Sequence, residues 1–152
     1  MKKTVLIMVA ALALVACKSN DKKAAPVETT SKEEIQKAVT DSTQFTTLQW
    51  LDSTTQQLGD LTKDKEVEIT WRFKNAGDKI LIIENVSAQC GCTIPEKPQQ
   101  PFAPGEEGVI KAKFNGSGTA GQPVSKQVYV IANTNPSKNH TLVFSGKISD
   151  KK

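Results

Sequence analysis

Residues 66–74 alternate strictly between polar and apolar side chains, the pattern of a β-strand with one buried face. Val67, Ile69, Trp71 and Phe73 share the apolar side. The same two-residue period recurs in residues 47–50, 110–114, 128–132 and 142–148, and residues 80–83 are apolar on both faces. Several short strands without a long helical pattern predict a β-sandwich or a β-barrel.

Turn signals separate these strands, at residues 75–78, 104–105, 116–118 and 133–136. About 100 residues in this arrangement suit a sandwich. We therefore predict one all-β domain over residues 45–148, a sandwich of about seven strands with a short tail at 149–152. Large aromatic side chains in alternating strands fill the space between sheets, so we expect Trp50 and Trp71 in the core.

The amino terminus has the layout of a secretory signal, with Lys2 and Lys3 ahead of an apolar run. The run is shorter than the roughly 20 residues of a membrane-spanning helix. It ends in Leu14-Val15-Ala16-Cys17, which resembles the lipobox of bacterial lipoproteins, where the cysteine thiol receives a diacylglycerol. We predict a lipoprotein signal peptide over residues 1–16 and acyl chains, such as palmitate, on Cys17. An ordinary cleavage site beside an unmodified Cys17 is the alternative.

Residues 17–44 are polar and predict a tether between the lipid anchor and the domain. As a flexible coil, this length spans roughly 30 Å. Ser31 and Glu34 have the spacing of a capping box, and Ile35, Ala38 and Val39 share one face, so we expect a short helix within the tether.

The charge balance argues against nucleic acid as a partner. Removal of Lys2 and Lys3 with the signal lowers the formal net charge from +4 to +2, and lysines alternate with glutamates along the chain. The chain holds one histidine, and it shows neither a phosphate-binding glycine loop nor a catalytic carboxylate motif. We therefore expect no enzyme activity.

Four segments together resemble the bacterial domain-of-unknown-function family 1573 (DUF1573): Trp71–Asp78, Cys90–Thr93, Pro101–Gly105 and Asn133–Asn135. The resemblance covers residues 45–148. It implies an immunoglobulin-like sandwich related to Hydin-type and chaperone-like modules, in lipoproteins of Gram-negative bacteria, and it implies no activity. Gln57-Leu58-Gly59 departs from the pattern, because relatives tend to carry an aromatic residue before the glycine.

Cys90 and Cys92 form a pair separated by Gly91. In an extended strand their Cα atoms would lie about 6.6 Å apart, near the upper limit for a disulfide, although Gly91 relaxes that limit. Three roles stay open: a local disulfide or thiol pair that shapes a strand end, a redox pair, or a Cu(I) site. No neighbouring group that lowers a thiol pKa is visible in the sequence. A closed zinc site needs four ligands, and His140, which we expect at the surface, is far along the chain.

Residues 94–105 contain four prolines and predict an irregular loop that cannot be a central strand. Such a loop serves either recognition or the protection of a sheet edge.

These observations favour a membrane-tethered, non-catalytic interaction module that binds an unknown periplasmic protein. Lys18 rather than aspartate follows Cys17, which by its resemblance to enteric sorting rules favours the outer membrane. The competing hypothesis is a thiol-redox or copper-handling protein that uses Cys90 and Cys92.

Overall fold

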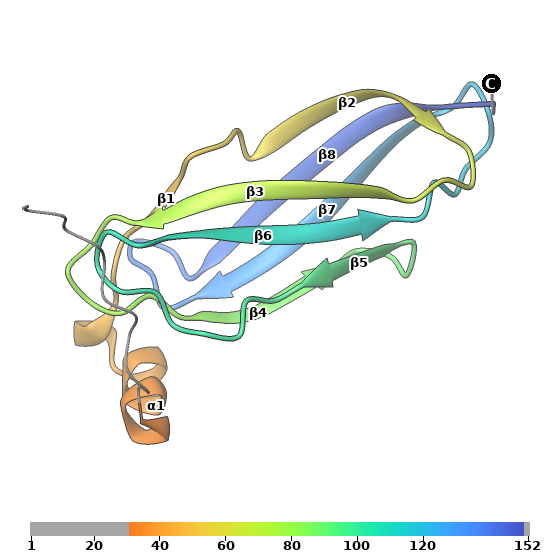
Figure 1. Ribbon diagram of the computed structural model, residues 1–152. Helices are drawn as coiled ribbons and strands as arrows, with labels where there is room; N and C mark the ends of the chain where they lie inside the picture. Colours follow the sequence, from red (N-terminus) through yellow and green to blue (C-terminus); the bar gives the residue numbers. More distant parts are fainter. Residues whose placement is uncertain (1–30, 151–152) are drawn as a thin grey trace, which may run out of the picture.

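The strands form two four-stranded sheets packed face to face, as seen in the computed structural model, which describes residues 31–150 (Figure 1). The first sheet has the order β1-β3-β6-β5 and the second has the order β2-β8-β7-β4. The strands are β1 (Leu48–Trp50), β2 (Thr55–Thr62), β3 (Val67–Asn75), β4 (Ile83–Ala88), β5 (Thr93–Glu96), β6 (Glu107–Phe114), β7 (Pro123–Ala132) and β8 (Asn139–Ser149). The predicted all-β sandwich is confirmed.

The core between the sheets is built by the residues whose alternation predicted it. Trp71, Phe73, Phe114 and Phe144 are fully buried, and Trp50 packs against this cluster. The Trp50 and Phe73 rings meet edge to face with their centroids 5.9 Å apart. Each fully buried large apolar side chain contributes about 1.5–3 kcal/mol to folding, so this aromatic layer is a major source of stability. The predicted core position of Trp71 is confirmed, whereas Trp50 is half-buried and packs against the core from its edge.

Strand β2 was not predicted from the sequence. It pairs in parallel with β8, and a register shift between Gln57 and Asp60 interrupts the pairing. The shift moves the inward-facing positions out of a two-residue period, which hides the strand in the sequence. Gln56 Nε2 donates a hydrogen bond to the carbonyl oxygen of Thr70 on β3 (2.8 Å), which links the two sheets along this side of the sandwich.

The proline-rich segment is partly a strand, which corrects the expectation of a loop over residues 94–105. Strand β5 includes Pro95 and pairs with β6 only. An edge strand tolerates proline because one side of its backbone has no neighbouring strand to receive an N–H group. The rest of the segment is irregular until Phe102, which exchanges backbone hydrogen bonds with Leu81 at 2.8 and 2.9 Å.

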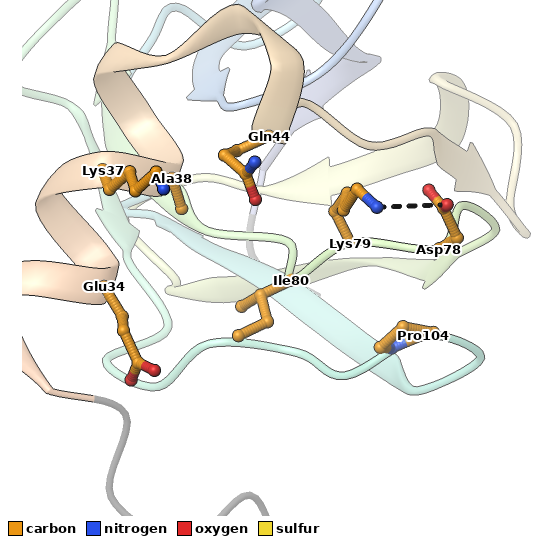
Figure 2. Close-up of a pocket in the computed structure, with 8 residues that line it drawn as sticks. All are labelled: Glu34, Lys37, Ala38, Gln44, Asp78, Lys79, Ile80 and Pro104. Atoms are coloured by element: carbon orange, nitrogen blue, oxygen red, sulfur yellow. Dashed lines mark hydrogen bonds and ion pairs between the residues drawn. The ribbon is translucent and has the colours of Figure 1, made fainter.

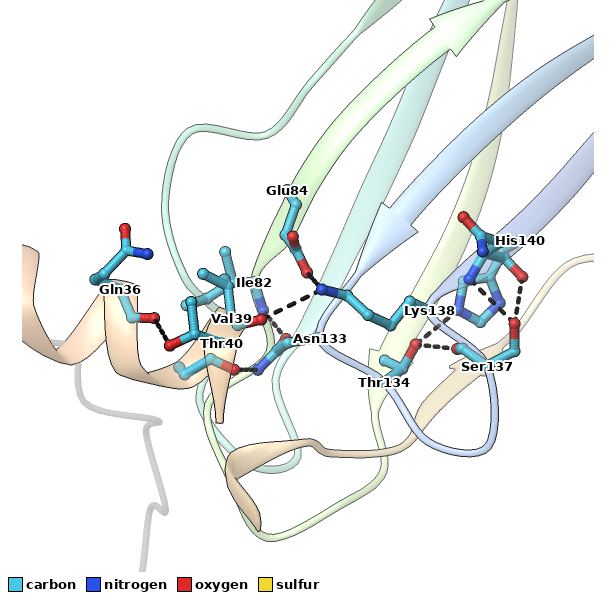
Figure 3. Close-up of polar contacts among 12 residues, drawn as sticks. Gln36, Val39, Thr40, Ile82, Glu84, Asn133, Thr134, Ser137, Lys138 and His140 are labelled. Atoms are coloured by element: carbon cyan, nitrogen blue, oxygen red, sulfur yellow. Dashed lines mark hydrogen bonds and ion pairs between the residues drawn. The ribbon is translucent and has the colours of Figure 1, made fainter. Parts of the chain in front are cut away.

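A short helix, α1 (Lys32–Thr40), precedes the sandwich and is followed by a single 3₁₀ turn, η1 (Ser42–Gln44). Ser31 and Glu34 form the predicted capping box, which confirms the short helix. Lys138 Nζ donates to the carbonyl oxygen of Val39 (3.2 Å) and lies 2.8 Å from Glu84 Oε1 (Figure 3). The segment assigned to the tether therefore contains a helix that is bonded to the sandwich.

Two fully buried asparagines hold the loops at the end of the sandwich that carries α1. Asn133 Oδ1 accepts from the Ile82 amide (2.7 Å), and its Nδ2 donates to the carbonyl oxygens of Ile80 (2.8 Å) and Ala38 (3.2 Å). Asn75 makes an equivalent set of bonds to Thr46 Oγ1, Gly77 N, Lys79 O and Phe102 O.

Cys17 and the predicted signal peptide lie outside the described residues. Across residues 31–150, no helix is both long enough and apolar enough to cross a membrane.

Replacing Asn133 by alanine should lower the free energy of unfolding by about 2–3 kcal/mol, because the Ile82 amide and the Ile80 carbonyl would lose their buried partner. Urea unfolding followed by tryptophan fluorescence measures this change. Asn85→Ala, at an exposed position, is the matched control and should change the value by less than about 0.5 kcal/mol. Equal effects of the two substitutions would show that the buried amide does not stabilise this end of the fold.

Gly108→Ala should also destabilise the domain, by about 1–3 kcal/mol, because an added methyl overpacks the core. A Cβ atom at Gly108 would lie 2.4 Å from Phe73 Cζ and 2.5 Å from a Phe102 ring carbon. Gly91→Ala is the control, since a Cβ there meets no atom within 4 Å. Thermal melts of both variants test this, and an unchanged midpoint for Gly108→Ala would contradict it.

Candidate functional site

Cys90 and Cys92 are joined by a disulfide in the turn between β4 and β5. The turn brings their Cα atoms to 5.3 Å, well inside the usual range for a disulfide and shorter than the roughly 6.6 Å expected for an extended strand. This turn carries the chain from the edge of the second sheet to the edge of the first. It lies at the opposite end of the sandwich from α1 (Figure 1).

A single hydroxyl lies beside both sulfur atoms. Thr93 Oγ1 is 4.0 Å from Cys90 Sγ and 3.9 Å from Cys92 Sγ, and Thr93 is buried. Both cysteines are half-buried and Gly91 is exposed. The arrangement therefore offers a disulfide close to solvent with one weak hydrogen-bond donor beneath it.

His140 is half-buried, not at the surface as expected from the sequence. Its ring lies edge-on to Trp50, and its Nε2 is 2.8 Å from Thr134 Oγ1 (Figure 3). Thr134 donates its one hydroxyl proton to the Ser137 carbonyl oxygen. The Nε2–H group of His140 is therefore the donor in its hydrogen bond to Thr134 Oγ1. Burial lowers the pKa of His140, which favours the neutral ring. In residues 31–150, no three His, Cys, Asp or Glu side chains gather closely enough to hold a metal ion.

A cavity of about 350 Å³ lies between α1 and the β3–β4 connection (Figure 2). Glu34 and Lys37 come from the helix, and Asp78 and Lys79 come from the connection, where they form an ion pair of 3.3 Å. Two acidic and two basic groups leave the walls without a net charge.

The outer faces of the two sheets differ sharply in charge. The outward residues of the second sheet carry no charge along most of its length, and we call them the charge-poor face: Thr55, Gln57, Asn85, Ser87, Ser125, Gln127, Tyr129, Ile131, Asn139, Thr141, Val143 and Ser145. Tyr129 lies near its centre, between Ser87 and Thr141 in the register, and donates a hydrogen bond to Gln127 Oε1 (2.7 Å).

The outer face of the first sheet is charged and cross-linked by ion pairs. Lys111 lies 3.7 Å from Glu68, and Lys113 lies 3.7 Å from Glu96, in both cases across neighbouring strands. Exposed pairs of this kind add little to stability. Their effect is to keep this face hydrated, in contrast to the charge-poor face.

A groove of about 530 Å³ crosses β2, β8 and β7 at one end of the charge-poor face. Gly59 and Gly146 are among the residues that line it, and their backbones lie close together, since a Cβ at Gly146 would lie 2.7 Å from the Gly59 carbonyl oxygen. Charge returns at this end of the face, with Asp60 opposite Lys147 in the strand register.

Solved structures with the same architecture confirm the immunoglobulin-like fold. A protein of unknown function from Porphyromonas gingivalis W83 superposes with a TM-score of 0.59 at 13% identity, over 70% of this chain and 48% of that one. The chain thus spans about half the length of that protein. The ASH/PapD-like domain of human CEP192 gives 0.55 at 11% identity, over 71% of this chain and 89% of that domain. Identities this low show the fold alone.

No curated protein matches the sequence. The family described as a protein of unknown function, DUF1573, matches residues 48–148, close to the range of the resemblance drawn from the sequence. The chain therefore belongs to the DUF1573 family.

Proposed function

We propose that this protein is a membrane-tethered, non-catalytic interaction module of the periplasm, and that its charge-poor face binds another protein. The observation that carries the proposal is the segregation of charge between the two outer faces. The cores of protein interfaces are depleted in charged residues and enriched in tyrosine. The charge-poor face lacks charged residues along most of its length and carries Tyr129, the one tyrosine of the chain, 37% exposed near its centre.

The desolvation cost explains why a face of this kind suits a protein partner. Serine, threonine, asparagine and glutamine side chains can exchange water for hydrogen bonds in an interface, whereas a buried unpaired charge costs several kcal/mol. Burial of the charged face of the first sheet would take the Glu68–Lys111 pair and the charge of Arg72 out of water, and the desolvation of paired charges can exceed their mutual attraction. Burial of the charge-poor face would not incur this cost.

A non-catalytic role is consistent with the engagement of the polar side chains that enzymes use most often. His140 is held by Thr134 and Trp50, and Asp52 is paired with Arg72 at 2.7 Å, a contact that lowers the pKa of Asp52. Both side chains stabilise contacts between neighbouring segments of the fold.

The sequence of the amino terminus supports the cellular location. The lipobox-like segment ending at Cys17 would place the protein on a membrane, and Lys18 favours the outer membrane, facing the periplasm. Helix α1 would then mark the end of the sandwich nearest to the membrane. The β4–β5 turn would point away from it.

Photocrosslinking tests the binding face in cells that produce the full-length protein. A benzoylphenylalanine probe at Tyr129 should give a discrete product with a second protein. The same probe at Val109 on the opposite face, which is also 37% exposed, should not. Thr141→Lys should lower the Tyr129 product at least about tenfold, because it buries an unpaired charge.

Thr70→Lys is the matched control, since Thr70 is an exposed threonine on a central strand of the charged face. It should leave the Tyr129 product unchanged. The proposal fails if both probe positions give the same products, if neither gives one, or if the two lysine variants behave alike.

Labelling with palmitate tests the lipid anchor. Wild-type protein should incorporate the label and sediment with outer membranes in a density gradient, since several acyl chains hold a protein to a bilayer. Cys17→Ala should lose the label and leave the membrane fraction, whereas Cys90→Ser should keep both properties. A Cys17→Ala protein that still incorporates the label, or a wild-type protein that does not, would reject this anchor.

A further inference from the structure

The turn that carries Cys90 and Cys92 is held by backbone hydrogen bonds as well as by the disulfide. The Thr93 amide donates to the Cys90 carbonyl within the turn (3.2 Å). On either side, Gln89 N donates to Gln127 O (3.2 Å) and Asn115 N donates to Cys92 O (3.1 Å). Both arms of the turn are therefore fixed to neighbouring strands independently of the sulfur atoms.

The disulfide also adds little as a cross-link. A disulfide stabilises a fold mainly by restricting the unfolded chain, and this effect grows with the length of the closed loop. Here the bond joins residues only two positions apart. A bond with so small a structural effect can open and close while the domain stays folded.

The turn around the bond is open to solvent at Gly91. Gly91 is exposed, and a Cβ placed on it would meet no atom within 4 Å. Both cysteines are half-buried, and strand β5 at the edge of the first sheet presents Ile94, which is 62% exposed, next to the turn. A thiol-bearing protein would thus meet an open turn with an apolar contact beside it.

Thr93 supplies a hydrogen-bond donor that can assist thiol–disulfide exchange. When an incoming thiolate attacks one sulfur, the other sulfur leaves as a thiolate, and a leaving thiolate of lower pKa departs faster. The Thr93 hydroxyl is nearly equidistant from both sulfurs, so it can donate a hydrogen bond to either one as negative charge develops.

From these contacts we infer a second role, separate from binding at the charge-poor face: the Cys90–Cys92 disulfide is a thiol–disulfide exchange site that oxidises exported proteins carrying a dithiol, stoichiometrically and once per disulfide, with Thr93 as a positioning residue. The first substrate thiolate attacks a sulfur of the disulfide, forming a mixed disulfide and releasing one cysteine thiolate, which takes up a proton. The second substrate thiol, on losing its proton, attacks the mixed disulfide. The substrate leaves with a new disulfide, and Cys90 and Cys92 are left as two thiols, so two electrons have moved from substrate to protein.

The test uses the full-length protein, purified in detergent without reductant, and dithiothreitol as the probe dithiol. Alkylation and mass spectrometry of the peptide containing Cys90 and Cys92 follow reduction, and near-ultraviolet circular dichroism follows the fold. We expect full reduction under native conditions with an unchanged spectrum. Oxidised glutathione should then restore the disulfide. Reduction that occurs only when the domain unfolds would overturn the inference.

The role of Thr93 is tested by comparing the rates at which the disulfide is reduced in variants that remain folded. Thr93→Val keeps the side-chain shape but removes the hydroxyl, and it should slow reduction on the order of fourfold, because a leaving thiol of higher pKa departs more slowly. Thr93→Ser restores the hydroxyl and should restore the rate, although it leaves a smaller side chain in the core. Equal rates for wild type and Thr93→Val would remove Thr93 from the mechanism.

Variants with a single cysteine in the turn test the exchange itself. Cys92→Ser and Cys90→Ser each leave one thiol, and at least one of these variants should form a mixed disulfide with an oxidised cysteine-containing peptide. If neither does, or if the reduced pair instead takes up Cu(I) and no longer reacts with oxidised glutathione, the exchange assignment is wrong. Neither result affects the charge-poor face, which these variants leave intact.

Discussion

The buried amide of Asn133 is the contact on which the arrangement of one whole end of the domain depends. Its side chain bonds to three backbone groups from α1 and the β3–β4 connection, and its own carbonyl oxygen accepts from the Thr46 amide (3.0 Å). A buried amide is costly unless every polar atom is paired. Here the pairing is met by segments that are far apart in the chain, so it can be satisfied only when they have all assembled. Asn75 applies the same constraint to the loop that leads into β6.

The sequence allowed the central strands and their inward faces to be predicted, because an uninterrupted two-residue period needs no knowledge of the partner strand. Among the edge strands, β1 was predicted from its alternation, whereas β2 and β5 were harder to predict. Strand β2 has few apolar residues and a bulge that shifts its period, and β5 carries Pro95. His140 was misplaced for a related reason. Its burial depends on Trp50 from another strand, a contact that no local pattern contains.

The charge-poor face was missed, although part of its signal is present in the sequence. Alternation shows which side chains point outward, but not which strands share a sheet. Outward positions in β3 and β6 are mostly charged, whereas those in β7 and β8 are mostly uncharged, and each of these pairs is adjacent in one sheet. The charge of the outward residues therefore groups β3 with β6 and β7 with β8, which are the central pairs of strands in the two sheets.

The spacing of Cys90 and Cys92 in the sequence does not settle whether they can form a disulfide, but the strand topology does. A separation of about 6.6 Å holds for an extended strand, yet the chain must turn at Gly91 because β4 and β5 belong to different sheets. The turn shortens the distance between the two Cα atoms and exposes the residue between them. It also lies at the end of the sandwich opposite the two buried asparagines. The contacts that fix the loops around α1 are therefore separated from the bond that can react, and a change in the redox state of Cys90 and Cys92 need not be transmitted to the fold.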